Sequence, residues 1–448
     1  MTVLRKIVTD KIANNIFIEI NRKMVLFTVV GLILFGYGFQ LLRIPPRGFG
    51  VPLAEIVLFF SLILLNPALV THRLKKVFPV WVLYAWVAYG SIHLILAFGQ
   101  YGYQAVRQAS PIYEALFLYV GFGLSCDDKF IILFVKILKV CIFLLLGYAL
   151  LYPVREIVFS LSPVLISTQG KIHPIFGNYS STPIFMVVFS SIALRHYYIS
   201  GKTSNLFLGG GLILTAIILF PSRTLILELV IVTLLLLYLY RGYSKQRKFV
   251  LLGFLITFLV VFSLLGATME SRLGSEFSLT DYSQLASEIF QVNSNSNQLS
   301  SGNDQRIEHW ADIIGRWSDS FSTIVVGLGY GVPLIKFIDA TGALVTEPHN
   351  SFISVLGRGG LVGFGLFIVL KFSLFKVLYN ASNTLKEDEI YGDLFIFSFV
   401  LFICMLINGL GEAPYVSPYL AVPYYFTVGV ALRAYSLRKT NQLLGCYE

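Results

Sequence analysis

The chain has 448 residues, of which 56% are apolar and 13% are charged, and its mean hydropathy is +0.75. A soluble domain of this size cannot cover so much apolar surface with polar groups, so these values exclude a water-soluble globular protein. The formal net charge of +10 does not point to nucleic acid, because excess Lys and Arg is usual in the cytoplasmic loops of membrane proteins.

The apolar residues lie in long unbroken runs, such as 249–268, and not in short alternating segments. This pattern favours membrane-spanning helices over a barrel. The first run, 24–42, follows a basic segment, is longer than a signal-peptide core and has no small-x-small cleavage site. We therefore expect it to be a retained first span.

About 20 apolar residues cross the hydrocarbon core of a bilayer, and this length predicts about twelve spans. They are expected at residues 24–42, 49–70, 78–99, 109–125, 130–152, 181–199, 205–220, 224–240, 249–268, 350–371, 391–410 and 418–434. The sequence thus predicts an all-α integral membrane protein in three parts. Residues 1–268 hold the first nine helices, 269–349 form a long loop, and 350–448 hold three helices and a tail.

Lys and Arg residues orient these spans. With the N-terminus inside, about two thirds of the 34 Lys and Arg residues fall on the inner side, as the positive-inside bias requires. Both termini are therefore expected in the cytoplasm, and the long loop is expected on the periplasmic side. We call that side the outer side.

The long loop, 269–349, is much longer than the other connections and is expected to be functional or disordered. Its polar middle, Gln291–Ser301, looks disordered. From Asn303, an expected N-cap, apolar residues recur at helical spacing and include Trp310 and Trp317. These tryptophans suit a helix that lies at the membrane–water boundary.

Residues that are distant in the chain converge on the outer side in this topology. Arg223 lies in the tight turn between the seventh and eighth spans. It either extends toward the lipid headgroups or, as the isolated charge of an apolar hairpin, has a binding task. Arg306 and Trp310 are four residues apart and share a face of the predicted interfacial helix, although an ordinary amphipathic helix has the same pattern.

His349 opens the tenth span, because Pro348 disfavours helix at Glu347 and the helix then begins near His349 or Asn350. An imidazole can accept a proton near neutral pH, but a histidine that only caps a loop fits the local sequence equally well. Glu412, at the end of the eleventh span, either orients an arginine or caps its helix, and the sequence leaves this open.

Glycines and cysteines in the chain favour structural roles. The Gly327-x-Gly329-x-Gly331 segment has no strand–loop–helix context for phosphate binding and is expected to be a flexible turn. The glycines of the tenth span are expected to allow close helix packing. The four cysteines have no CxxC pair, and no cluster of ligands has convincing metal spacing, so no metal is expected.

Several of these elements, taken in order, resemble a known family. The stretch from Arg306 to Trp310, the Gly327–Gly331 segment, Pro348-His349-Asn350-Ser351-Phe352 and Gly360-Leu361-Val362-Gly363 resemble the shared region of O-antigen ligases and Wzy-type polymerases. Ser222-Arg223 is similar to that family's arginine at an outer hairpin. The motif region covers roughly residues 205–370. A departure is Arg358, where relatives often have an acidic residue.

The resemblance implies a GT-C-like membrane fold and metal-independent, inverting glycosyl transfer without a cofactor. The donor is a glycan on undecaprenyl diphosphate, the acceptor is a lipid A-core sugar, and the site faces the periplasm of a bacterial inner membrane. Arginine pairs bidentately with phosphate oxygens, so Arg223 and Arg306 are candidates to hold the diphosphate. His349 is the candidate general base. Trp310, Asn350 and Glu412 complete the set of candidate substrate-binding residues.

Two other functions remain open. The first is a polymerase of the same superfamily, whose acceptor is a second lipid-diphosphate glycan. One long outer loop favours a ligase, because many polymerases have two comparable outer loops. The second is a lipid or glycan transporter without catalysis, which usually has ionisable residues near the bilayer midplane. Interior charges appear few in the sequence, which disfavours transport.

Overall fold

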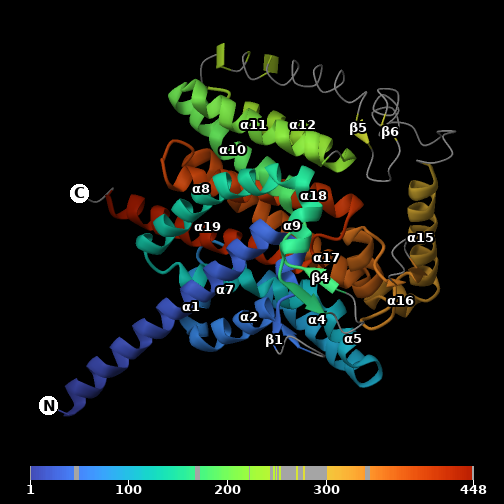
Figure 1. Ribbon diagram of the computed structural model, residues 1–448. Helices are drawn as coiled ribbons and strands as arrows, with labels where there is room; N and C mark the ends of the chain where they lie inside the picture. Colours follow the sequence, from blue (N-terminus) through green and yellow to red (C-terminus); the bar gives the residue numbers. More distant parts are fainter. Residues whose placement is uncertain are drawn as a thin grey trace.

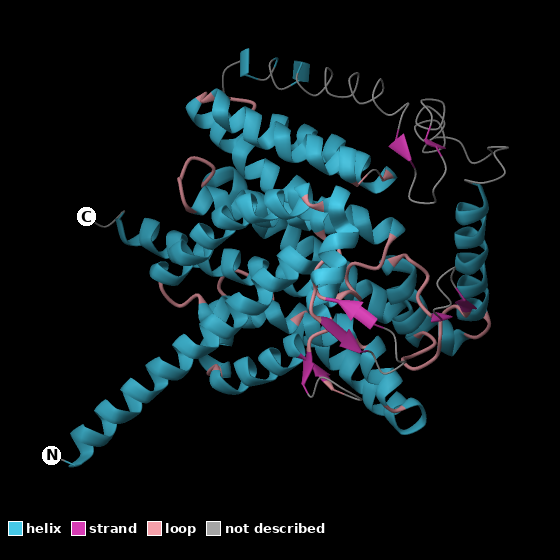
Figure 2. Cartoon of the chain, viewed as in Figure 1, coloured by secondary structure: helices cyan, strands magenta, loops and turns pink. Residues whose placement is uncertain are grey.

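The computed structural model describes residues 2–44, 50–166, 172–220, 222–242, 300–338 and 344–445, with short pieces at 246–247, 249, 252–253, 269–270 and 276–277. This part of the chain is a bundle of helices with short strands only in the connections (Figures 1 and 2). The helices of the first half are α1 (Thr2–Gln40), α2 (Leu53–Leu64), α3 (Pro67–Leu74), α4 (Val80–Tyr101), α5 (Tyr103–Gln108), α6 (Ser110–Glu114), α7 (Leu116–Leu124), α8 (Asp128–Leu150), the 3-10 helix η1 (Tyr152–Val154), α9 (Arg155–Leu161), α10 (Thr182–Ser200), α11 (Thr203–Leu219) and α12 (Arg223–Leu239). Those of the second half are α15 (Ser300–Ser318), α16 (Phe321–Val326), α17 (Ser351–Thr384), α18 (Tyr391–Gly411) and α19 (Pro418–Gly445).

The strands of the described residues form four two-stranded antiparallel hairpins. They are β1 (Arg43–Ile44) with β2 (Val51–Pro52), β3 (Val164–Ile166) with β4 (Ile172–Pro174), β5 (Met269–Glu270) with β6 (Glu276–Phe277), and β7 (Phe337–Ile338) with β8 (Leu344–Val345). In the longest hairpin Leu165 is opposite His173. The hairpins lie in connecting segments. The packed layers of the protein therefore consist of helices alone in the described residues.

The protein is a polytopic membrane protein. In the described residues α4, α8, α17 and α18 are long and apolar enough to cross a bilayer, and α2 with α3 makes a possible fifth span. Shorter apolar helices lie at Ser110–Leu124, Thr203–Leu219 and Thr224–Leu239. The predicted spans coincide with helices or helix pairs, except that 249–268 lies almost wholly outside the described residues. The total of twelve stays a prediction.

The second predicted span, 49–70, is not one straight helix. α2 and α3 meet at a bend of 92°. Asn66 caps α3, with its side chain accepting from the Leu69 amide at 3.2 Å. Pro67 follows at the first helical position and has no N–H to continue α2. An N-cap followed by proline starts a new helix. The prediction missed this break because it considered only the length of the apolar run.

The tenth predicted span, 350–371, reverses direction inside α17. Gly360 has φ 59° and ψ −163°, a backbone that other residues rarely adopt. The rings of Phe352 and Phe367 lie 6.0 Å apart, whereas fifteen residues of straight helix would separate them by about 22 Å. The segment before Gly360 therefore folds back on the longer segment after it. Only the part after Gly360 can cross a bilayer, so the span begins later than predicted.

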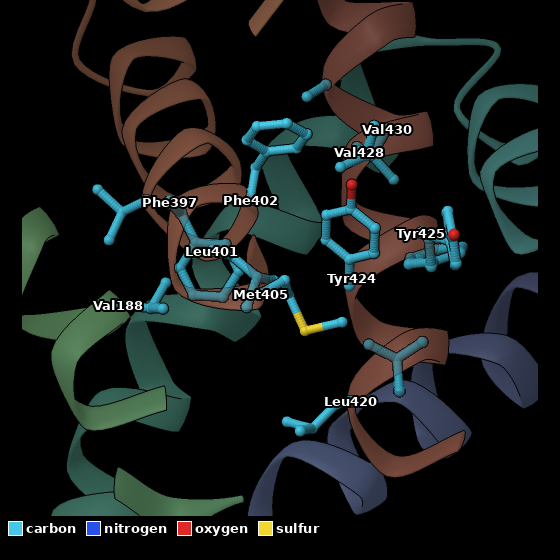
Figure 3. Close-up of a cluster of buried hydrophobic side chains, with 14 of the residues drawn as sticks. Val188, Phe397, Leu401, Phe402, Met405, Leu420, Tyr424, Tyr425, Val428 and Val430 are labelled. Carbon is cyan, nitrogen blue, oxygen red and sulfur yellow. The ribbon is translucent and has the colours of Figure 1, made fainter. Parts of the chain in front are cut away.

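The core is built around α18, which is the most buried candidate span: 72% of its apolar window is buried, against 28–44% for the other three. Its Phe402 and Met405 pack between Val188 of α10 on one side and Tyr424 of α19 on the other (Figure 3). Because α18 contacts α10, α12, α17 and α19, its two ends are held by several helices at once. This central position matters for the site described next.

The described helices form a bundle with two distinguishable ends. The start of α1 and the end of α19 lie at one end, and α15 and α16 lie at the other (Figure 1). At the first end Arg22 pairs with Asp127 at 2.7 Å and Arg195 pairs with Asp393 at 2.6 Å, and the two arginines are among the residues that the positive-inside bias places on the inner side. We call this the opposite end, and the end that carries His349 the site end. Which end faces the cytoplasm stays a prediction.

Candidate active site

The turn that carries His349 is set by the start of α17. Asn350 is the N-cap, and its side-chain oxygen accepts from the amides of Phe352 and Ile353, both at 3.0 Å. The helix thus begins at Ser351, as Pro348 indicated. His349 has φ 49°, which makes it the one non-glycine residue with positive φ in the described chain. A histidine in this sparsely populated region is held there by its surroundings.

His349, Glu412 and Arg306 come together at the site end. The Nδ1 atom of His349 lies 3.0 Å from one carboxylate oxygen of Glu412, and a guanidinium nitrogen of Arg306 lies 3.5 Å from the other. Arg306 also donates to the Gly411 carbonyl at 3.0 Å. The three side chains are 43%, 50% and 40% exposed, so they remain open to a ligand.

Glu412 fills both roles that the sequence left open. It is the C-cap residue of α18, with its amide bonded to the Asn408 carbonyl at 2.7 Å, and its side chain orients an arginine. The contact with His349 is a third role. When Nδ1 carries the proton donated to Glu412, the Nε2 lone pair is free to accept another.

Trp310 and Asn350 connect the turn at His349 to α15 and to the end of α18 by hydrogen bonds. The indole Nε1 of Trp310 donates to the Pro348 carbonyl at 2.9 Å. The Asn350 side-chain amide donates to the Leu410 carbonyl at 2.9 Å, which ties the start of α17 to the end of α18. Asn350 is 6% exposed, and these hydrogen bonds already use both ends of its amide. Its contacts are those of a positioning residue.

The helix predicted from Asn303 forms, but it begins earlier than predicted, and its position at the membrane boundary stays a prediction. α15 starts at Ser300, so Asn303 lies inside its first turn and is not the N-cap. Ile313 is buried against Leu334 and Ile335, while Ile307 remains 54% exposed on the other side. One face of α15 therefore packs on the protein and holds Arg306 at the site. Of the stretch expected to be disordered, Gln291–Ser301, residues 291–299 lie outside the described residues, and Ser300 and Ser301 belong to α15.

Arg223 is the first residue of α12, at the site end. Ser222 caps the helix, with its hydroxyl accepting from the Leu225 amide at 3.2 Å. A side chain at Gly411 would meet the Thr224 hydroxyl at 3.7 Å, so the start of α12 lies beside the residue that precedes Glu412. The Arg223 backbone thus lies near the cluster, while its side chain lies outside the described atoms.

The loop after α16 packs directly on α17. Gly327 and Gly360 both have positive φ, and a side chain on either would collide with the backbone of the other segment. The Leu328 amide donates to the Gly357 carbonyl at 2.7 Å. Burial raises the pKa of Tyr330 in this loop, and nearby Arg358 offsets part of that rise. The segment is a turn as predicted, but its glycines serve close backbone contact.

Arg358 is a functional candidate that the sequence reasoning missed. It is 4% exposed, forms an ion pair with Glu347, and donates to Gln108 at 2.6 Å and to the Val332 carbonyl at 3.1 Å. Gln108 in turn accepts from the Gly331 amide at 2.5 Å. Arg358 thereby links the glycine loop to the residue two before His349. The signal that could have found it was its departure from the family pattern.

No group of three or more His, Cys, Asp or Glu residues that could hold a metal ion occurs in the described part of the chain. The cluster offers a base oriented by a carboxylate and one guanidinium, with a second arginine on the adjacent helix. That set suits proton abstraction from a hydroxyl next to a bound anionic group.

Comparison with known proteins gives a match to a family model. No curated protein matches the chain. Residues 208–368 match the model of a family described as O-antigen ligase. The matched segment contains Arg223, Arg306, His349 and Arg358 but not Glu412. The segment that supplies most of this site therefore matches the O-antigen ligases, the family that its motifs resemble.

Proposed function

We propose that the protein is an O-antigen ligase, a glycosyltransferase that moves a glycan from undecaprenyl diphosphate to a lipid A-core sugar at the periplasmic face. The observation that carries the proposal is the Glu412 carboxylate shared by His349 and Arg306, at 3.0 and 3.5 Å. Residues from α15, the α17 turn and the end of α18 meet there, next to the start of α12. The family match covers all of these segments except the end of α18.

His349 acts as the general base in this proposal. Its Nε2 accepts the proton of the acceptor hydroxyl while that oxygen attacks the anomeric carbon. Glu412, at Nδ1, fixes the tautomer that leaves Nε2 unprotonated and stabilises the imidazolium that forms. Trp310 and Asn350 hold the turn so that the imidazole does not rotate away.

The arginines act on the leaving group. As the new C–O bond forms, the bond from the anomeric carbon to the phosphate oxygen breaks, and its electron pair leaves with undecaprenyl diphosphate. Attack from the opposite face inverts the anomeric carbon. Arg306, and Arg223 at the start of α12, neutralise the charge that develops on the diphosphate. Arg306 can exchange its contact with half-exposed Glu412 for a phosphate oxygen without moving its helix.

A polymerase of the same superfamily is the alternative enzyme. The preference for a ligase rested on one long outer loop, yet residues 151–166 and 172–181 belong to a second connection at the site end, with α9 and the β3–β4 hairpin. Loop number therefore separates the two functions less well than expected. Cells that lack the gene separate them: loss of a ligase leaves long chains on the lipid carrier, and loss of a polymerase leaves single repeats on the core.

A transporter is the alternative from another class, and buried ionisable groups favour it. Glu114, Glu228 and Lys371 are each less than 5% exposed within predicted spans, so interior charges are more prominent than the sequence indicated. Lys371 lies over the Tyr415 ring at 3.6 Å and donates to the Tyr425 hydroxyl at 3.1 Å. A transporter would move glycan lipid across vesicle membranes without forming a new glycosidic bond.

The deciding experiment is transfer in vitro with purified protein, an undecaprenyl-diphosphate glycan and two acceptors offered separately. A ligase forms product only with lipid A-core, and a polymerase forms it only with a second lipid-diphosphate glycan. Arg223→Ala should lower the rate about a hundredfold, because a lost transition-state contact costs about 3 kcal/mol. Transfer should continue in excess chelator. A strict need for a divalent metal would contradict the mechanism.

A further inference from the structure

Arg358 lies on the first segment of α17, two residues before the reversal at Gly360. In a helix each Cα–Cβ bond is tilted toward the N-terminus, and residues four apart share a face. Ser354 and Arg358 are therefore directed back along one face, toward the residues that precede α17. Both contact Glu347 there. The Ser354 hydroxyl donates to one carboxylate oxygen at 3.1 Å, and the Arg358 guanidinium forms an ion pair with the other.

The contacts of Arg358 leave its guanidinium no freedom to bind a ligand. One terminal nitrogen pairs with Glu347, and the other donates to the Gln108 side chain at 2.6 Å and to the Val332 carbonyl at 3.1 Å. The residue is 4% exposed, so it could reach a phosphate only by leaving these acceptors. Arg306, with a side chain that is 40% exposed, has no such constraint. Arg358 therefore does not belong to the arginines proposed to hold the diphosphate.

Glu347 is occupied in the same way and is not a second base. Both of its carboxylate oxygens have protein partners, and its side chain is 20% exposed, against 50% for Glu412. The ion pair also makes the two residues interdependent. Removing either charge leaves the other one largely buried without its partner, which is costly.

The turn at His349 needs support on both sides, because its positive φ of 49° is a conformation that a histidine adopts only when its surroundings impose it. Trp310 holds the Pro348 carbonyl, and Asn350 holds the side that continues into α17. Glu347 is the residue by which the chain enters the turn. Its ion pair with Arg358 fixes that side.

We infer that Arg358 is a positioning residue for the proposed base: by fixing Glu347 it holds the turn that places Nδ1 of His349 against Glu412. The inference rests on the proposed function. Displacement of a catalytic group by about 1 Å can lower a rate by about a hundredfold, so loss of this support should lower kcat. Because Arg358 and Glu347 do not contact substrate in this scheme, the KM values for donor and acceptor should not change.

The test measures transfer with Arg358→Gln, Glu347→Gln and the double variant, each corrected for the amount of folded protein. We expect kcat to fall about twentyfold in Arg358→Gln and about tenfold in Glu347→Gln, with both KM values within about twofold of wild type. The double variant should fall about twentyfold, because the two residues act through one contact, whereas independent effects would multiply to about two-hundredfold. Arg358→Lys keeps the charge and should recover kcat to within about fivefold of wild type.

Arg316→Gln is the matched control. Arg316 of α15 donates to the carbonyls of Pro333 and Leu334, next to the residue that Arg358 holds, and has no contact with Glu347 in the described residues. Its kcat should stay within about twofold of wild type, since the turn keeps its support. An equal fall in this control, multiplied effects in the double variant, or a raised KM with an unchanged kcat overturns the inference. If Arg358→Gln does not fold, Glu347→Gln decides by the same kcat and KM criteria.

A second readout needs no turnover and so separates this inference from the proposed function. Hydrogen–deuterium exchange, followed by mass spectrometry, should be faster in Arg358→Gln at residues 344–353 and 327–332 and unchanged in α10. Local acceleration shows that Arg358 holds the turn even if wild-type protein transfers nothing, a result that would count against the proposed function alone. Unchanged exchange at 344–353, or acceleration throughout the described helices, overturns the inference.

Discussion

The two ends of α18 carry clusters of the same residue types in opposite environments. At the opposite end Asp393 receives Arg195 at 2.6 Å, Lys139 at 2.7 Å and His196 at 3.0 Å. At the site end Glu412 receives Arg306 and His349. The first carboxylate is 0% exposed and the second is 50% exposed.

The two clusters differ in how many of their hydrogen-bonding positions are already occupied by the protein. Arg195 is 1% exposed and also donates to the carbonyls of Lys386 and Asp388, so its hydrogen bonds all serve the packing of α10 against α18. Within the described residues, Arg306 makes one backbone contact and one long ion pair, and His349 has one ring nitrogen without a protein hydrogen-bond partner. An Arg–His–carboxylate set therefore does not by itself mark an active site. Exposure and free hydrogen-bonding positions distinguish the two.

The largest expected effect is on stability and comes from the opposite end. Asp393→Ala leaves the Arg195 charge buried and unpaired, which should lower the free energy of unfolding by about 3–5 kcal/mol. Glu412→Ala, at the half-exposed cluster, should lower it by less than about 1 kcal/mol. Thermal unfolding in detergent, followed by tryptophan fluorescence, measures both. Equal losses at the two ends would remove the distinction between a structural and an open cluster.

The next effect is on activity and comes from the site end. His349→Ala should lower the transfer rate at least about a hundredfold, because general-base catalysis is lost, while the protein still accumulates in membranes. His196→Ala is the matched control, since His196 makes the same kind of contact with Asp393. It should keep transfer within about twofold. Near-normal transfer by His349→Ala would remove the general-base assignment.

Helix positions were predictable from the sequence because the thickness of a bilayer sets the length of apolar runs. Bends and reversals of the chain inside these runs were not predictable. The bend before Pro67 and the reversal at Gly360 both lie inside continuous apolar composition, and each is set by one residue's backbone chemistry. Hydropathy averages over about 20 residues, so a single such residue does not register.

The site was predictable to the extent that topology places residues on one side. Arg306, His349 and the start of α12 do lie at one end. The role of Glu412 was not predictable, because its partners come from α15 and the α17 turn, and their distances depend on tertiary packing. Arg358 was missed for the same reason: its partners Gln108 and Glu347 lie in different elements.

The substitution Glu412→Gln tests whether the charge of the carboxylate at the site end is needed for catalysis. The substitution keeps the shape but removes the charge that stabilises the imidazolium, so the rate should fall about tenfold, or about 1.4 kcal/mol. Glu412→Asp should recover part of the rate. A wild-type rate in Glu412→Gln would show that the charge of Glu412 is not needed for transfer.

The smallest expected effect comes from the hydrogen bond between Trp310 and the turn that carries His349. Trp310→Phe keeps the ring in place but removes the hydrogen bond to the Pro348 carbonyl, a net loss of about 1 kcal/mol. Because His349 follows Pro348 with a positive φ, a less constrained turn should place the imidazole correctly less often. We expect kcat to fall about fivefold with an unchanged donor KM. Trp317→Phe is the control, since its indole donates to Ile324 on α16 and does not contact the turn. A fall of the same size in that control would assign the effect to the general stability of α15, and not to the position of the base.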